Sequence, residues 1–208
     1  LMQLRYPKVQ VGFLGFSQAG WVIPIAASQS QPAFSVIIGG AVNWREQGQY
    51  YQKLRYEQQG KTPDEIIQLL AKEQKENDDI FGLHGTKDRT RRNDMSEDRF
   101  NFVVKNYLSD SSSYLRKMNG RILAVWGNND LNVNAQLNAC RYRAILNTHH
   151  QADIVVFPHA SHGLLRVPEF NYQLESDWPI YRQLQFLWAG RKAYTEGSLH
   201  SWGSRSLS

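Results

Sequence analysis

Short apolar runs alternate with helical patterns along most of the chain. Four runs rich in valine, isoleucine, leucine or phenylalanine predict strands, and they are Val9–Phe16, Ala33–Ile38, Arg121–Trp126 and Ala152–Phe157. Three helical patterns stand after these runs, and they are Trp21–Ser28, Asn132–Leu146 and Trp178–Trp188. The first run is typical of a strand that is buried on both faces of a parallel sheet. The alternation predicts the α/β class, a mostly parallel sheet flanked by helices.

The stretch between the second and third runs has a different character, with polar and aromatic residues at helical spacing. Thr62-Pro63-Asp64-Glu65 is a capping box with proline at the first helical position, and it predicts the start of a long helix. Another helix is predicted over Asp98–Leu108. We therefore expect a helical cap insertion over about 43–118, within one domain that spans 1–208. Its aromatic residues either line a substrate pocket or form an ordinary core.

Ser17 directly follows the first run and precedes the first helical pattern. Gly15 and Ala19 stand two residues before and after it, and Gly20 leaves room for close packing of the helix. A strand, a serine among small residues and a helix are the features of a nucleophile elbow, where the serine has a strained backbone. Ala19 stands where the usual G-x-S-x-G pattern has its second glycine. An ordinary residue of a strand-to-helix turn is the other interpretation of Ser17.

An aspartate and a histidine stand in corresponding loops after later strands. Asp130 follows the third run and His162 the fourth, and in parallel sheets the loops at the carboxyl ends of the strands carry the reacting groups. An imidazole can take a proton from a serine hydroxyl, and a carboxylate can orient the imidazole. Asp130 could instead cap the following helix, and His159 competes with His162. The carboxylates of Asp153 and Asp177 are poorer candidates, and the remaining histidines are expected to face solvent.

Three segments together resemble a known superfamily. GFSQAGWVIPIAAS, AVWGNNDLNVN and VVFPHASHGLL are similar to the nucleophile, acid and histidine segments of the α/β-hydrolases, near their bacterial esterase and dipeptidyl-peptidase-like (prolyl oligopeptidase-type) members. The resemblance implies a catalytic triad of Ser17, Asp130 and His162, and it favours His162 over His159 because a glycine follows it. It also implies that the backbone amide of Gln18 donates to the oxyanion hole.

The implied activity is that of a serine hydrolase, similar to a carboxylesterase, which cleaves an ester or related acyl bond of a small molecule through an acyl-enzyme. Acyl-CoA thioesterase, acyltransferase or peptidase activity and a catalytically inactive fragment are the alternatives. The superfamily carries its serine after the fifth strand of about eight, whereas Ser17 follows the first strand here. We therefore expect a partial α/β-hydrolase fold, the C-terminal portion of a longer hydrolase. The missing portion would hold the second oxyanion donor, a partner for the first strand and any targeting segment.

Composition adds several exclusions. The 208 residues carry a net charge of +5, but the excess is scattered. Its densest cluster, at Lys87, Arg89, Arg91 and Arg92, is expected to be a solvated loop and not a nucleic-acid site. No apolar stretch is long enough for a membrane span. No histidines and carboxylates have metal-ligand spacing, so we expect neither a metal nor a cofactor. The single cysteine, Cys140, is expected to be buried in a helix.

Overall fold

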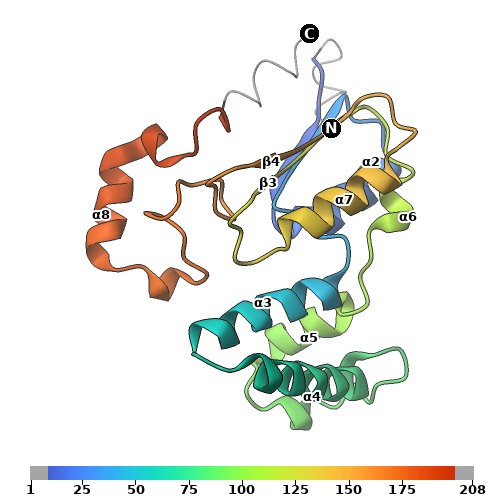
Figure 1. Ribbon diagram of the computed structural model, residues 1–208. Coiled ribbons are helices and arrows are strands. Elements are labelled where there is room, and N and C mark those ends of the chain that lie inside the picture. The colour runs from blue at the N-terminus through green and yellow to red at the C-terminus, as the bar shows by residue number, and fades with distance from the viewer. Residues whose placement is uncertain (1–8, 200–208) are drawn as a thin grey trace. The chain divides into compact units, whose positions relative to one another are not determined.

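The computed structural model describes residues 9–199 of the chain. Two compact units divide the chain, one made of residues 1–42 and 111–208 and the other of residues 43–110. The first unit contains the sheet, and Figure 1 shows its strands with helices on both sides. This arrangement confirms the predicted α/β class. The interpretation of the second unit as a cap stays a prediction.

Among residues 9–199, the sheet has four strands in the order in which they occur in the chain, and all neighbouring pairs are parallel. The strands are β1 (Phe13–Phe16), β2 (Phe34–Ile38), β3 (Arg121–Gly127) and β4 (Ala152–Phe157). The unit also contains the helices α2 (Ala19–Ser28), α6 (Ser112–Leu115), α7 (Ala135–Ile145) and α8 (Ile180–Ala189), with the 3₁₀ turns η2 (Glu175–Asp177) and η3 (Gly190–Ala193). Parallel strands that follow one another across a sheet bring their carboxyl ends to one edge. The loops after β1, β3 and β4 therefore share that edge.

The two faces of the sheet are covered differently. Figure 1 shows α2 and α7 on one side of the strands and α8 on the other. On the α7 side, the buried ring of Trp126 meets the ring of Tyr142 with centroids 5.0 Å apart. On the opposite side, residues of β2 and β3 pack with Ala160 and Leu164 of the loop after β4. That loop is thus part of the core, which fixes its position.

Three details differ from the sequence prediction. The first strand is shorter than predicted, and its side chains alternate, with Leu14 56% and Phe16 46% exposed. The expectation of burial on both faces was wrong because no element among residues 9–199 covers the face of β1 that carries Leu14 and Phe16. The helix expected from Asn132 begins at Ala135, since the residues before it form a loop. Cys140 is exposed, because α7 turns its neighbours Ala139 and Tyr142 inward instead.

The second unit is helical. It contains α3 (Trp44–Gln58), α4 (Pro63–Phe81), the 3₁₀ turn η1 (Arg89–Arg92) and α5 (Glu97–Asn106). The predicted capping box at the start of α4 is confirmed: the Thr62 hydroxyl accepts from the Glu65 amide, and the Glu65 carboxylate accepts from the Thr62 amide at 2.8 Å. Aromatic residues make the core, where the ring of Phe81 lies 5.2 Å from that of Phe100 and 5.7 Å from that of Tyr107. No helix among residues 9–199 is both long enough and apolar enough to cross a membrane.

Candidate active site

Ser17 lies in a tight turn between β1 and α2. Its φ of 50° falls in the left-handed region, which is costly for a residue with a Cβ atom. The turn is held by a hydrogen bond of 2.7 Å from the Ser17 amide to the carbonyl of Ile38 on the neighbouring strand. Small residues are needed around it, since a Cβ atom on Gly15 would lie 2.6 Å from the Cβ of Ala19. A Cβ on Gly20 would likewise lie 2.8 Å from the backbone of Ala41.

Gln18 stands at the start of α2, and its backbone carbonyl and backbone amide differ in their hydrogen bonds. The carbonyl accepts from the amides of Trp21 at 3.0 Å and Val22 at 3.3 Å. The Gln18 amide, by contrast, donates to no other residue of the described range 9–199. An unpaired amide at a helix N-terminus, where the helix dipole is positive, suits an anion. The assignment of this amide to an oxyanion hole stays a prediction.

The carboxylate of Asp130 is buried, and both of its oxygens have hydrogen-bond partners. One oxygen, Oδ2, lies 2.7 Å from Nδ1 of His162. The other, Oδ1, accepts from the amides of Asn132 at 2.7 Å and Val133 at 2.8 Å. The side chain therefore has a single orientation. The helix that follows, α7, is capped by Asn134 and not by Asp130, since the Asn134 side chain accepts a hydrogen bond from the Leu137 amide at 3.0 Å.

His162 packs against Gly39, which directly follows β2, the strand that pairs with β1. A Cβ atom on Gly39 would lie 2.8 Å from Cε1 and 2.9 Å from Nδ1 of His162, so the ring rests on the glycine backbone. Gly39 directly follows Ile38, the residue that binds the Ser17 amide. In the tautomer in which Nδ1 carries the hydrogen and donates to Oδ2 of Asp130, Nε2 keeps a lone pair. The ring can then accept a proton from a hydroxyl on its free side.

The loops that carry Asp130 and His162 are joined through their backbones. The amide of Asn128 donates to the Phe157 carbonyl at 2.8 Å, and that of Asn129 to the Ala160 carbonyl at 2.9 Å. The contact is so close that a Cβ on Gly127 would lie 2.2 Å from the Ser161 carbonyl oxygen. In the sequence, Gly39 and Gly127 directly follow the second and third apolar runs. A glycine placed directly at a strand end was the signal for these two close approaches.

The other histidines and aspartates considered for the triad lie away from the Asp130–His162 pair or are exposed to solvent. His159 is exposed, and its carbonyl accepts from Val167 at 3.1 Å and from the Thr195 hydroxyl at 3.1 Å. Asp153 lies exposed on β4, and Asp177 accepts from the Leu174 amide at 3.3 Å. Within the described residues, Asp130 is the acid that binds His162. His84 and His150 are exposed, and His200 lies outside the described residues.

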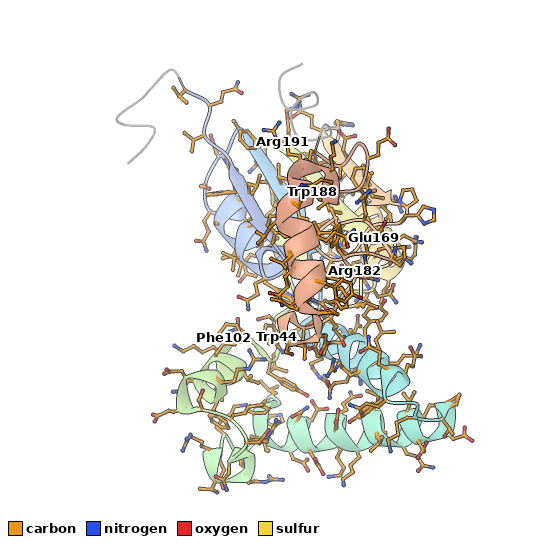
Figure 2. All side chains as sticks on the ribbon, turned by 90° about the vertical axis from the view of Figure 1, so that its left-hand side faces the viewer. Trp44, Phe102, Glu169, Arg182, Trp188 and Arg191 are labelled. Carbon is orange, nitrogen blue, oxygen red and sulfur yellow. The ribbon has the colours of Figure 1, made fainter. Side chains whose placement is uncertain are left out.

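A separate cleft of about 700 Å³ lies wholly within the second unit. Its wall is partly aromatic, and Trp44 contributes to it next to Phe102, with ring centroids 5.5 Å apart (Figure 2). Arg92 is fixed in the cleft by two hydrogen bonds of 2.9 Å to Asp94 and one of 2.7 Å to Asn77. Lys87, Arg89 and Arg91 of the basic cluster are exposed, as expected for a solvated segment, whereas Arg92 is half-buried; Arg91 and Arg92 also line the cleft. The aromatic residues of this unit form both core and cleft wall.

Ionisable groups of the second unit are tuned by their neighbours. Partial burial and the hydrogen bond to Asp78 raise the pKa of Tyr107 to about 12. The guanidinium of Arg92 lowers the pKa of Asp94 through its hydrogen bonds. No group of three or more His, Cys, Asp or Glu side chains that could hold a metal ion lies among residues 9–199.

The sheet, the elbow and the bonded Asp130–His162 pair define an α/β protein of the hydrolase type. The chain belongs to the family described as BAAT / acyl-CoA thioester hydrolase C terminal, which matches residues 2–204. The match confirms the resemblance to α/β-hydrolases that the three sequence segments indicated. No curated protein sequence matches the chain.

Several solved structures are similar in part. An acylaminoacyl peptidase of Pyrococcus horikoshii is 11% identical with a TM-score of 0.42, over 78% of this chain and 22% of its own. A puromycin-hydrolysing peptidase of Mycobacterium tuberculosis is 16% identical with a TM-score of 0.41, over 73% and 18%. An esterase of Pyrococcus furiosus is 12% identical with a TM-score of 0.44, over 92% and 58%. The chain thus spans only 22% and 18% of the two peptidases.

Proposed function

We propose that this chain carries the catalytic triad of a serine hydrolase, with Ser17 as nucleophile, His162 as general base and acid, and Asp130 as the group that orients His162. One observation carries the proposal. A buried carboxylate, held by two backbone amides, binds Nδ1 of a histidine whose ring packs on Gly39, directly after the strand that pairs with β1, the strand leading to Ser17. Such an arrangement suits proton transfer from a serine hydroxyl.

The reaction follows from these roles. The Ser17 Oγ attacks the acyl carbonyl carbon while its proton passes to Nε2 of His162. Asp130 stabilises the resulting imidazolium without taking the proton itself. The proton then goes to the leaving group as its bond to the acyl carbon breaks, which leaves an acyl-enzyme. Water attacks that ester and gives a proton to His162. The bond between the acyl carbon and Ser17 Oγ then breaks, His162 returns the proton to Oγ, and the carboxylic acid is released.

The reaction is slow unless the negative charge that develops on the substrate's carbonyl oxygen is stabilised. The Gln18 amide is the hydrogen-bond donor that this chain supplies for that oxygen. It has no competing acceptor among the described residues and lies at the N-terminus of α2. One such donor typically contributes a factor of about 10²–10³ to the rate.

The substrate is proposed to be a small acyl compound, and the first candidate is an oxygen ester. The family description favours a second candidate, an acyl-CoA thioester. The triad serves both, because the two reactions differ only in the leaving group. Acyl transfer to an acceptor other than water would use the same acyl-enzyme.

Labelling with a fluorophosphonate tests the nucleophile. The purified chain is treated with the probe, and the modified peptide is identified by mass spectrometry. Label on Ser17 that is lost in both Ser17→Ala and His162→Ala supports the triad. Ser30→Ala, a change at an exposed serine of the same segment, is the matched control and should keep the label. A folded chain whose label lies elsewhere contradicts the proposal.

A substrate panel then separates the candidates. p-Nitrophenyl esters, acyl-CoA thioesters and aminoacyl amides are compared by kcat/KM in the wild-type chain and in Ser17→Ala. The ester proposal requires that the esters give the highest value and that Ser17→Ala removes it. A preference for thioesters supports the second candidate and overturns the first.

A further inference from the structure

The end of β2 contacts both of the residues proposed to react. The carbonyl of Ile38, the last residue of β2, accepts a hydrogen bond of 2.7 Å from the Ser17 amide. The next residue, Gly39, supports the His162 ring, because a Cβ atom there would lie 2.8 Å from Cε1 and 2.9 Å from Nδ1. A shift of these two adjacent residues would therefore disturb the serine turn and the imidazole together.

Gly39 turns the chain out of the sheet. Its φ is 61°, and its amide donates to the carbonyl of Val125 on β3 at 2.8 Å. The following residue, Gly40, lies against the elbow helix α2, since a Cβ atom on it would be 2.9 Å from the Cα of Gly20. Gly39 is thus held on one side by the sheet, and on the other side its position depends on what holds Gly40.

Trp126 binds Gly40 from the neighbouring strand. Its indole Nε1 donates to the Gly40 carbonyl at 2.8 Å, and its side chain is fully buried. A buried indole N–H needs such a partner, and a buried carbonyl that loses its donor is costly. Trp126 belongs to β3, the strand that leads to the loop of Asp130. One side chain therefore connects the strand of the proposed acid to the segment that contacts both His162 and the serine turn.

We propose that Trp126 is a positioning residue for the hydrolase reaction. Its indole N–H fixes Gly40, and Gly40 in turn keeps Gly39 against the His162 ring. This inference rests on the proposed function, because it concerns the geometry of the same triad. Proton transfer depends on such support, since a displacement of about 1 Å can lower a rate by about 10²-fold.

Tyr142 offers a control that separates this role from simple packing. Its buried ring meets that of Trp126 with centroids 5.0 Å apart, but its hydroxyl has no hydrogen-bond partner among the described residues. Tyr142→Phe therefore alters the same aromatic pair and keeps the bond to Gly40. Trp126→Phe keeps an aromatic ring and removes the indole N–H.

The first measurement is the second-order rate constant for fluorophosphonate labelling of Ser17, divided by the folded fraction that urea denaturation gives for each variant. Trp126→Phe should lower this value by about tenfold or more. Tyr142→Phe should leave it within about twofold of the wild type. Because the rate constant refers to folded protein only, a loss of stability alone does not lower it.

The second measurement is nitrogen NMR of the whole chain with isotopically labelled histidine. The ring signals of His162 are identified by their loss in His162→Ala. They report the tautomer and the hydrogen bond to Asp130, so they should shift in Trp126→Phe and stay unchanged in Tyr142→Phe.

The outcomes distinguish this inference from the proposed function. Wild-type label on Ser17, with either an unchanged rate constant or unchanged His162 signals in Trp126→Phe, overturns the positioning role and leaves the triad proposal standing. A folded wild-type chain that does not label Ser17 overturns the proposed function, and the positioning role with it. If Trp126→Phe does not fold, β-(3-benzothienyl)alanine replaces Trp126, since its ring has the shape of indole and no N–H, and the same two changes are required.

Discussion

The two strands that lead to Ser17 and to Asp130 differ in how firmly the protein holds them. β3 lies inside the sheet, and all of its residues from Ile122 to Gly127 are buried. β1 has a single strand partner within residues 9–199 and alternates between half-buried and exposed side chains. A central strand is fixed by both neighbours and by packing on both faces, whereas an edge strand depends on one neighbour.

The difference teaches that the two halves of the candidate site are positioned by different means. The acid and histidine loops are joined by backbone hydrogen bonds and by the contact of Gly127 with Ser161. The serine turn relies on one backbone bond to Ile38 and on the close fit of Gly15 against Ala19. Substitution of Asp130 should therefore lower mainly the rate of catalysis. Substitutions in the strands should lower the free energy of unfolding more in the central strand β3 than in the edge strand β1.

The largest expected effect is on the acid half. Asp130→Asn keeps the size of the side chain but favours the wrong tautomer of His162, so kcat in the hydrolase assay should fall by about 10⁴-fold. Asp153→Asn, at an exposed carboxylate on β4, is the matched control and should leave kcat within about twofold of the wild type. If Asp130→Asn retains most of the activity in a folded chain, Asp130 is not the acid of the triad.

The second prediction compares edge and centre directly. Leu14 of β1 and Leu123 of β3 lie in one row across the sheet, with Val36 between them. Leu123 is 9% exposed and Leu14 is 56% exposed. Leu123→Ala should lower the free energy of unfolding by about 3 kcal/mol, and Leu14→Ala by less than about 1 kcal/mol. Urea denaturation measures both, and equal losses would show that another element covers β1.

Much of this arrangement could be predicted from the sequence, because local patterns determine it. The apolar runs locate the four strands, and the order of Ser17, Asp130 and His162 follows from the strand ends they occupy. The contact between Gly39 and His162 could not be predicted, since it joins loops of two strands that are far apart in the chain. Cys140 and the exposure of β1 were misjudged because periodicity shows that a face is apolar and not what covers it.

The third prediction addresses the contact between these loops. Gly39 has a φ of 61°, and a Cβ atom there would meet the His162 ring at 2.8 Å. Gly39→Ala should displace the ring and lower kcat/KM by about 10²-fold, with a loss of stability of roughly 1–2 kcal/mol from the strained backbone. Gly48→Ala, in α3 with no atom within 4 Å of the added methyl group, should instead raise stability by about 0.5–1 kcal/mol. Unchanged kinetics in Gly39→Ala would contradict the proposed role of His162.

The smallest expected effect concerns the second unit and depends on pH. The pKa of Asp94 is lowered by its hydrogen bonds to Arg92, so this pair stabilises the folded state above the unfolded pKa of about 3.9 and loses that contribution as pH falls through the folded pKa. Because Asp94 is largely exposed, the contribution near pH 7 should be only about 0.5 kcal/mol. Asp94→Asn should speed amide hydrogen exchange in η1 and the start of α5 at neutral pH. The difference from the wild type should vanish in acid, and Asp153→Asn should change neither segment. A difference that grows as the pH falls would mean that Asp94 acts through something other than its charge.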